Sequence, residues 1–202
     1  MFSGMIAGDP GQGGAAWAVL QYLMGFKRLG WNVCFVEPVL QKKLQPAGAA
    51  LEPSTNAEFF RKVMADFGLA DSSALLLSGT RRTVGLPYES LLAQAKSSAV
   101  LFNVSGMLAD PALFESVPVR VYLDLDPAFV QLWQTQGIDM RFAGHTHFVT
   151  VGQSIGRPQC SIPTCNIDWM HTLPPIVLDR WPVANRQHIH PTMVMAFKLY
   201  EF

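Results

Sequence analysis

The chain has 202 residues, of which half are apolar and only 15% are charged, so it can bury a large core within one domain. Its net charge is zero and its Lys and Arg residues form no cluster, which argues against a nucleic-acid partner. No apolar run has the length of a transmembrane segment, and early Gly, Asp and Pro residues interrupt any secretory signal. Three cysteines do not make a disulfide framework, so we expect a cytoplasmic protein with reduced thiols.

Residues 5–38 predict the first strand–helix–strand unit of a parallel α/β sheet. An apolar strand at residues 5–8 leads into a glycine-rich turn at residues 9–14. An apolar helix follows at residues 15–29, and a second apolar strand at residues 33–36.

The sequence indicates where this helix ends and what its N-terminus could bind. Lys27 and Arg28 occupy its last turn, and Gly30 stands where a helix commonly ends. The glycines before it leave backbone N–H groups uncovered at the helix N-terminus. Such a place is suited to a phosphate or a carboxylate.

Strands and helices continue to alternate through residue 156. After an exposed loop at residues 41–55, Ser54 or Thr55 is expected to cap a helix that stops at Gly68. Further strands are predicted at residues 74–77, 99–104, 119–124 and 146–151, with helices at residues 88–96, 112–115 and 128–135. This alternation predicts a doubly wound, Rossmann-like parallel sheet of five to six strands with helices on both faces, in a domain of residues 1–156.

The remaining chain differs in composition. Prolines recur through residues 157–182, which predicts an extended, proline-rich interdomain arm rather than a packed unit. Residues 183–202 predict neither a helix nor a strand, and we expect a truncated or atypical tail.

The glycine-rich turn is the first candidate ligand loop, formed by Gly11, Gln12, Gly13 and Gly14. With the alanines that follow, it matches the dinucleotide fingerprint G-x-G-x-x-A, and Glu37 ends the next strand, where an acid would hold a ribose hydroxyl. Two extra residues before the first glycine lengthen the turn, however, which is unusual for a dinucleotide site. A tight strand–helix turn without a ligand is the third interpretation.

Asp124 and Asp126 form a D-x-D sequence at the end of a predicted strand. Alternate residues on a strand point the same way, so both carboxylates could reach one metal ion. Pro127 begins the next helix, however, and Asp126 suits its N-cap. Capping or loop anchoring is therefore favoured over a metal, at the sheet edge where ligands bind in this architecture.

His145 and His147 flank the start of another predicted strand. A zinc pair is conceivable, but no third ligand lies at a suitable spacing. One histidine in a cleft is more plausible, with a packed loop histidine as the alternative. Asn103, Ser105 and Gly106 end a central strand, where a substrate-facing loop and a plain strand–turn junction are equally open.

Several of these stretches, taken in order, resemble the N-terminal domain of GT-B glycosyltransferases. The resemblance extends over residues 1–182 and is to uncharacterised bacterial glycosyltransferase-like proteins. The stretches are Gly8-Asp9-Pro10, Gly13-Gly14, Trp17, residues 25–33, 103–106, 124–127 with Gln131, 151–156, and the arm from residue 162 to residue 182.

The resemblance implies an acceptor-binding half of an enzyme that moves a sugar from a nucleotide-sugar to a hydroxyl. In that family a second Rossmann-like domain binds the donor. That domain is absent here, so we expect this chain to be inactive alone. The nucleotide-sugar is a co-substrate, and neither a cofactor nor a metal is implied. The exposed interdomain face would favour self-association.

The resemblance also implies roles for individual residues, which are named here as candidates. Donor phosphates would face Gly11, Gln12, Gly13 and Gly14, and the catalytic base would be Asp9, Asp126 or His147. The acceptor cleft would contain Asn103, Ser105, Gly106, Asp124 and His145. Two alternatives stay open: an NAD(P)-binding Rossmann module, and a non-catalytic domain that only binds a partner.

Overall fold

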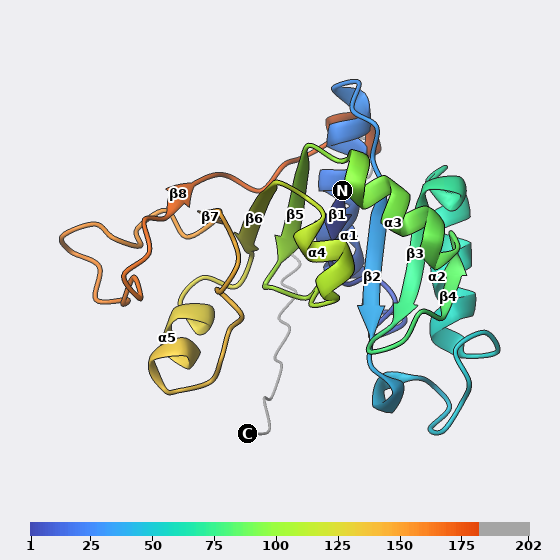
Figure 1. Ribbon diagram of the computed structural model, residues 1–202. Coiled ribbons are helices and arrows are strands. Elements are labelled where there is room, and N and C mark those ends of the chain that lie inside the picture. Colours follow the sequence, from blue (N-terminus) through green and yellow to red (C-terminus); the bar gives the residue numbers. More distant parts are fainter. Residues whose placement is uncertain (182–202) are drawn as a thin grey trace, which may run out of the picture.

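The computed structural model describes residues 1–181, and a single sheet of eight strands runs through them (Figure 1). The strand order is β4-β3-β2-β1-β5-β6-β7-β8, and every pair is parallel except β3 with β4. The strands are Phe2–Ser3 (β1), Phe35–Val39 (β2), Ser73–Leu77 (β3), Thr83–Gly85 (β4), Val100–Val104 (β5), Val119–Asp124 (β6), His147–Thr150 (β7) and Met170–His171 (β8). The predicted α/β class with a mostly parallel sheet is confirmed, with eight strands rather than five to six.

Helices cover both faces of the central strands of the sheet. Phe35 of β2 packs in one apolar cluster with α1 (Gly13–Arg28) and α2 (Thr55–Asp66). Its neighbour Val36 packs in another with α3 (Tyr88–Ser97) and α4 (Pro111–Glu115). Figure 1 shows α3 and α4 in front of the sheet, with α1 and α2 behind it. The fifth helix of the described chain, α5 (Phe129–Thr135), follows β6.

The first strand lies earlier than the sequence indicates. β1 is Phe2–Ser3, so the predicted strand at residues 5–8 is wrong, and these residues form the loop that leaves the sheet. β2 in turn continues through Pro38 to Val39. A proline is tolerated there because β1 pairs only with the first two residues of β2, and no ladder hydrogen bond toward β1 is needed at Pro38. Because β1 ends early, no strand of the described chain lies between the carboxyl ends of β2 and β5.

The predicted helix signals agree with the structure. Gly30 follows α1 with a φ of 84°, and Gly68 follows α2 with a φ of 62°. Both are left-handed conformations that glycine adopts without steric cost. Ser54 caps α2, because its side chain accepts a hydrogen bond from the amide of Ala57 at 3.1 Å.

Residues 157–181 contain only the two-residue β8 and the 3-10 helix Leu178–Arg180 as regular elements, and they contact the body of the protein. β8 adds a strand beside β7, and Trp169 is buried against Tyr122 of β6. Further on, the amide of Val177 donates to Gln21 Oε1 of α1 at 2.5 Å. The sequence gives no sign of these contacts because β8 has only two residues. The predicted tail, residues 183–202, lies outside the described residues.

Candidate functional site

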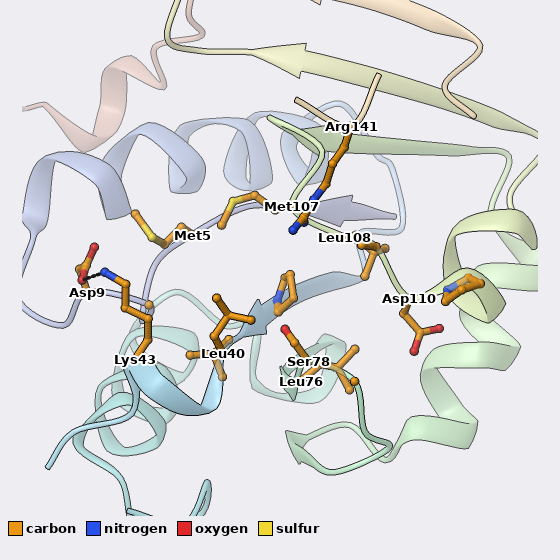
Figure 2. Close-up of a pocket in the computed structure, with 16 residues that line it drawn as sticks. Met5, Asp9, Leu40, Lys43, Leu76, Ser78, Met107, Leu108, Asp110 and Arg141 are labelled. Carbon is orange, nitrogen blue, oxygen red and sulfur yellow. Dashed lines mark hydrogen bonds and ion pairs between the residues drawn. The ribbon is translucent and has the colours of Figure 1, made fainter. Parts of the chain in front are cut away.

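A cavity of about 350 Å³ lies at the edge of the sheet where the parallel strands end (Figure 2). It occupies the place where β1 has stopped while its neighbours continue. The chain leaves the neighbouring strands β1 and β5 toward opposite faces of the sheet, to α1 and α4, and ligands bind in the crevice so formed in this architecture. The lining comes from the segments after β1, β2, β3 and β5, and from one residue ahead of β7: Met5, Gly8, Asp9, Pro38, Val39, Leu40, Lys43, Leu76, Ser78, Gly79, Met107, Leu108, Ala109, Asp110, Pro111 and Arg141.

The side chain of Glu37 holds the loop after β1 in place. Its carboxylate is fully buried and accepts hydrogen bonds from the amide of Ala7 at 2.8 and 2.9 Å and from that of Gly8 at 2.6 Å. Asn56 of α2 completes the clamp by donating to the carbonyl of Ala7 at 2.7 Å. Burial raises the pKa of Glu37 to about 7, although the bonds from the loop amides oppose this rise. Glu37 therefore acts as an internal support for the loop that carries Asp9.

Asp9 is the one predicted catalytic candidate that borders the cavity. It lies at the rim, half-buried, with Lys43 Nζ at 3.5 Å from its carboxylate (Figure 2). Lys43 comes from the short 3-10 helix after β2, Gln41–Lys43. The loops after β1 and β2 thus meet at one side of the cavity through an ion pair.

The predicted ligand loop is solvent-exposed and lies beside the cavity rather than in it. Gly11, Gln12, Gly13 and Gly14 are all exposed, and none of them lines the cavity. Gln12 makes no capping hydrogen bond to α1, so no side chain at that position covers the helix N-terminus. Gly14 borders a second hollow of about 270 Å³ between α1 and residues 174–175.

Asn103 is buried and organises the loop after β5. Its amide oxygen accepts from the backbone N–H of Leu108 at 2.9 Å, and its nitrogen donates to the carbonyl of Leu108 at 3.1 Å. Ser105 and Gly106 make the turn in between, with φ of 47° and 65°. None of these three predicted cleft residues lines the cavity, but they hold the segment from Met107 onward that does.

His145 is half-buried and packs against aromatic rings, including Tyr122 and Phe114. Its Nε2 lies 3.1 Å from Asn103 Nδ2, and its Nδ1 lies 3.3 Å from the carbonyl oxygen of Phe142. Because the amide nitrogen can only donate, we assign Nε2 as the acceptor and Nδ1 as the protonated nitrogen of a neutral ring. Burial lowers the pKa of His145, which agrees with this assignment. His147 begins β7, three strands away from β1, and is exposed outside the cavity.

Asp124 and Asp126 do not form a shared carboxylate pair. Asp124 is buried, and its oxygens accept from Gln131 Nε2 and Thr150 Oγ1, both at 2.8 Å, and from the amide of Asp126 at 3.0 Å. Loop anchoring therefore describes Asp124. The predicted N-cap role of Asp126 is wrong, because α5 begins later and Ala128 is its N-cap. The side chain of Gln131 reaches back to the amide of Ala128 at 2.8 Å instead.

Four polar residues of the cavity are missing from the sequence-based candidates: Lys43, Ser78, Asp110 and Arg141. Ser78 directly follows β3, and Asp110 precedes Pro111 as the N-cap of α4. Both residues could have been identified from the sequence, because polar residues that follow parallel strands gather at one edge of the sheet. Arg141 could not, because it belongs to the segment that leads toward the amino end of β7.

Two other features are absent from residues 1–181. No helix in this range has the length and apolar character needed to cross a membrane. No group of three or more His, Cys, Asp and Glu side chains in the same range is placed to hold a metal ion.

Comparisons of the chain with protein families, with curated proteins and with solved structures found no match. The interpretation of the site therefore depends on its own geometry.

Proposed function

We propose that the chain is the acceptor-side domain of a GT-B-like glycosyltransferase and that the cavity binds the hydroxyl acceptor. The observation that carries this proposal is the position of the cavity. It opens at the carboxyl edge of the parallel strands, on either side of the early-ending β1, with the carboxylate of Asp9 at its rim. Its volume of about 350 Å³ is within the range of small-molecule sites.

Asp9 is the base in this proposal. Asp126 is exposed on the loop before α5 and His147 is exposed at the start of β7, and neither lines the cavity. The carboxylate of Asp9 accepts the proton of the acceptor hydroxyl as its oxygen attacks the anomeric carbon of the nucleotide-sugar. The bond from that carbon to the diphosphate breaks, and the nucleoside diphosphate leaves with the electron pair.

The glycines of α1 support a donor on the outer side of the same loop. A Cβ added at Gly13 or Gly14 would meet nothing within 4 Å, so the described fold does not require glycine at either position. Both lie at the exposed beginning of a helix of 16 residues, where free amides and the helix dipole favour a phosphate. The proposal places the rest of the donor site outside residues 1–181.

In the dinucleotide-binding alternative, Glu37 would have to bind the ribose, but it is not available for this role. Glu37 lies in the middle of β2 rather than at its end, and both carboxylate oxygens already accept loop amides. A ribose would have to displace these bonds from a fully buried site. The acceptor-domain proposal is therefore the better supported of the two.

The test uses saturation-transfer NMR with a panel of hydroxyl compounds, comprising alkyl glycosides, aryl glycosides and aromatic alcohols. Ala109 is an exposed residue that lines the cavity, and Ala112 is an exposed neighbour that does not. Acceptor signals are expected for the unmodified protein and for Ala112→Trp, and to disappear for Ala109→Trp. Signals that persist in Ala109→Trp, or no binding by the whole panel, would refute the proposal.

A further inference from the structure

Four charged side chains border the cavity, and three of them are already engaged. Asp9 pairs with Lys43 at 3.5 Å. Asp110 accepts from Tyr88 Oη at 2.9 and 3.1 Å and caps α4, and Figure 2 shows its carboxylate turned aside from the centre of the cavity. Arg141 forms no ion pair with any residue of the range 1–181.

The position of Arg141 is fixed by its backbone and its neighbours. Its φ is 59°, a left-handed conformation that is unfavourable for a residue with a long side chain. The conformation is held because the amide of Arg141 donates to Asp139 Oδ1 at 2.8 Å. Across the gap, a Cβ at Gly106 would lie only 2.9 Å from the Cβ of Arg141, so the two segments are in close contact.

The guanidinium has hydrogen-bonding capacity left. Its one hydrogen bond within the described chain is the donation from Nη1 to the carbonyl of Gly106 at 3.3 Å, out of five N–H groups that an arginine carries. Figure 2 shows the side chain pointing into the cavity, with the hydroxyl of Ser78 on the opposite side. That hydroxyl has no hydrogen-bond partner among residues 1–181.

We propose that Arg141 binds an anionic group of the acceptor, so that the substrate is an anionic amphiphile. This inference rests on the proposed function of the cavity. A carboxylate or a phosphate fits the planar donors of the guanidinium, and Ser78 can donate to the same head group. The side chains of Met5, Leu40 and Met107 line the remaining surface and contact the apolar body of the ligand.

The experiment compares three small probes that share a benzene ring: phenyl phosphate, phenylacetate and the neutral 2-phenylethanol. Their dissociation constants are measured by NMR titration of the full chain. At least one anion is expected to bind about tenfold or more tightly than the alcohol, and the better anion identifies the head group. Equal affinities, or no binding by either anion, would overturn the inference.

Variants assign the effect to Arg141. Arg141→Gln is expected to reduce the affinity for the anion to that for 2-phenylethanol, whereas Arg141→Lys keeps part of the preference. Arg157, an exposed residue outside the cavity, provides the matched control Arg157→Gln, which should leave both affinities unchanged. An unaltered preference in a folded Arg141→Gln protein would contradict the inference.

The same titrations separate this inference from the proposed function. If a neutral aryl glucoside binds in the cavity and Arg141→Gln has no effect on any probe, the acceptor proposal stands and the anionic head group is refuted. If the anions bind through Arg141 but no hydroxyl compound binds, the anion site stands and the acceptor role fails.

Discussion

Replacing Glu37 by glutamine should change how the stability of this protein depends on pH. The variant removes a buried charge and keeps the shape of the side chain. One oxygen remains to accept the amides of Ala7 and Gly8. The new amide group takes the place of an oxygen that lies 2.9 Å from the nitrogen of Ala7, so one contact becomes unfavourable.

The magnitude follows from the pKa of Glu37, which burial raises from 4.5 to about 7. Below pH 4.5 the carboxyl is protonated in the folded and the unfolded chain, so it adds no pH dependence there. Between these values the folded protein retains a proton that the unfolded chain has lost, and the free energy of unfolding falls as the pH rises. The total loss is about 3 kcal/mol, at roughly 1.4 kcal/mol per pKa unit, and it levels off as the pH rises above 7.

Glutamine does not titrate, so the variant lacks this loss. Urea unfolding at pH 5 and pH 8 measures the difference, and other titrating groups, including His145, cancel between the two proteins. We expect Glu37→Gln to gain about 2–3 kcal/mol relative to the unmodified protein between pH 5 and pH 8. Glu58→Gln, an exposed change on α2, is the matched control and should show no such gain.

A difference between Glu37→Gln and the unmodified protein that stays constant across this pH range would refute the reasoning. It would mean that the carboxyl has the same pKa in the folded and unfolded chain. The loop amides would then offset the full cost of burying the charge.

Three further substitutions test the packing of the fold. Gly85→Ala would place a Cβ 2.3 Å from the carbonyl oxygen of Ser73, whereas Gly11→Ala meets nothing within 4 Å; both have positive φ. We therefore expect about 1–2 kcal/mol of destabilisation for Gly11→Ala and considerably more for Gly85→Ala, and equal urea midpoints would contradict the packing. Asn103→Ala leaves the buried N–H and C=O of Leu108 without partners and should cost about 2–4 kcal/mol in the same assay; a loss below 1 kcal/mol would show that the loop does not depend on Asn103.

The fold was predictable where local sequence determines it. The strand at residues 119–124 was predicted with the bounds of β6, because an apolar stretch interrupted only by Arg120 ends at an acidic turn. The first strand was misplaced because residues 5–8 are apolar for a different reason. Ile6 and Ala7 are buried in the apolar cluster with α1 and α2, in a loop whose amides donate to Glu37 of another strand. β4 and β8 are too short to produce a periodic pattern, and their pairing depends on contacts distant in the sequence.

The site was only partly predictable for the same reason. Asp9 follows the first strand and was identified from the sequence. Asn103 and Asp124 were correctly placed near the carboxyl edge, but their side chains hold loops together instead of facing a ligand. Arg141 reaches the cavity from a segment that precedes β7, and its contact with the distant Gly106 holds it there. No sequence pattern encodes such a contact.

The most direct test of the account is an amide chemical-shift map of the full chain during titration with an acceptor from the hydroxyl panel. The cavity proposal predicts that the shifts concentrate at Gly8, Ser78, Gly79 and Ala109, the rim formed by three different loops. Shifts concentrated instead around Trp17 and Gln21 in the second hollow, or at His147 at the start of β7, would contradict it.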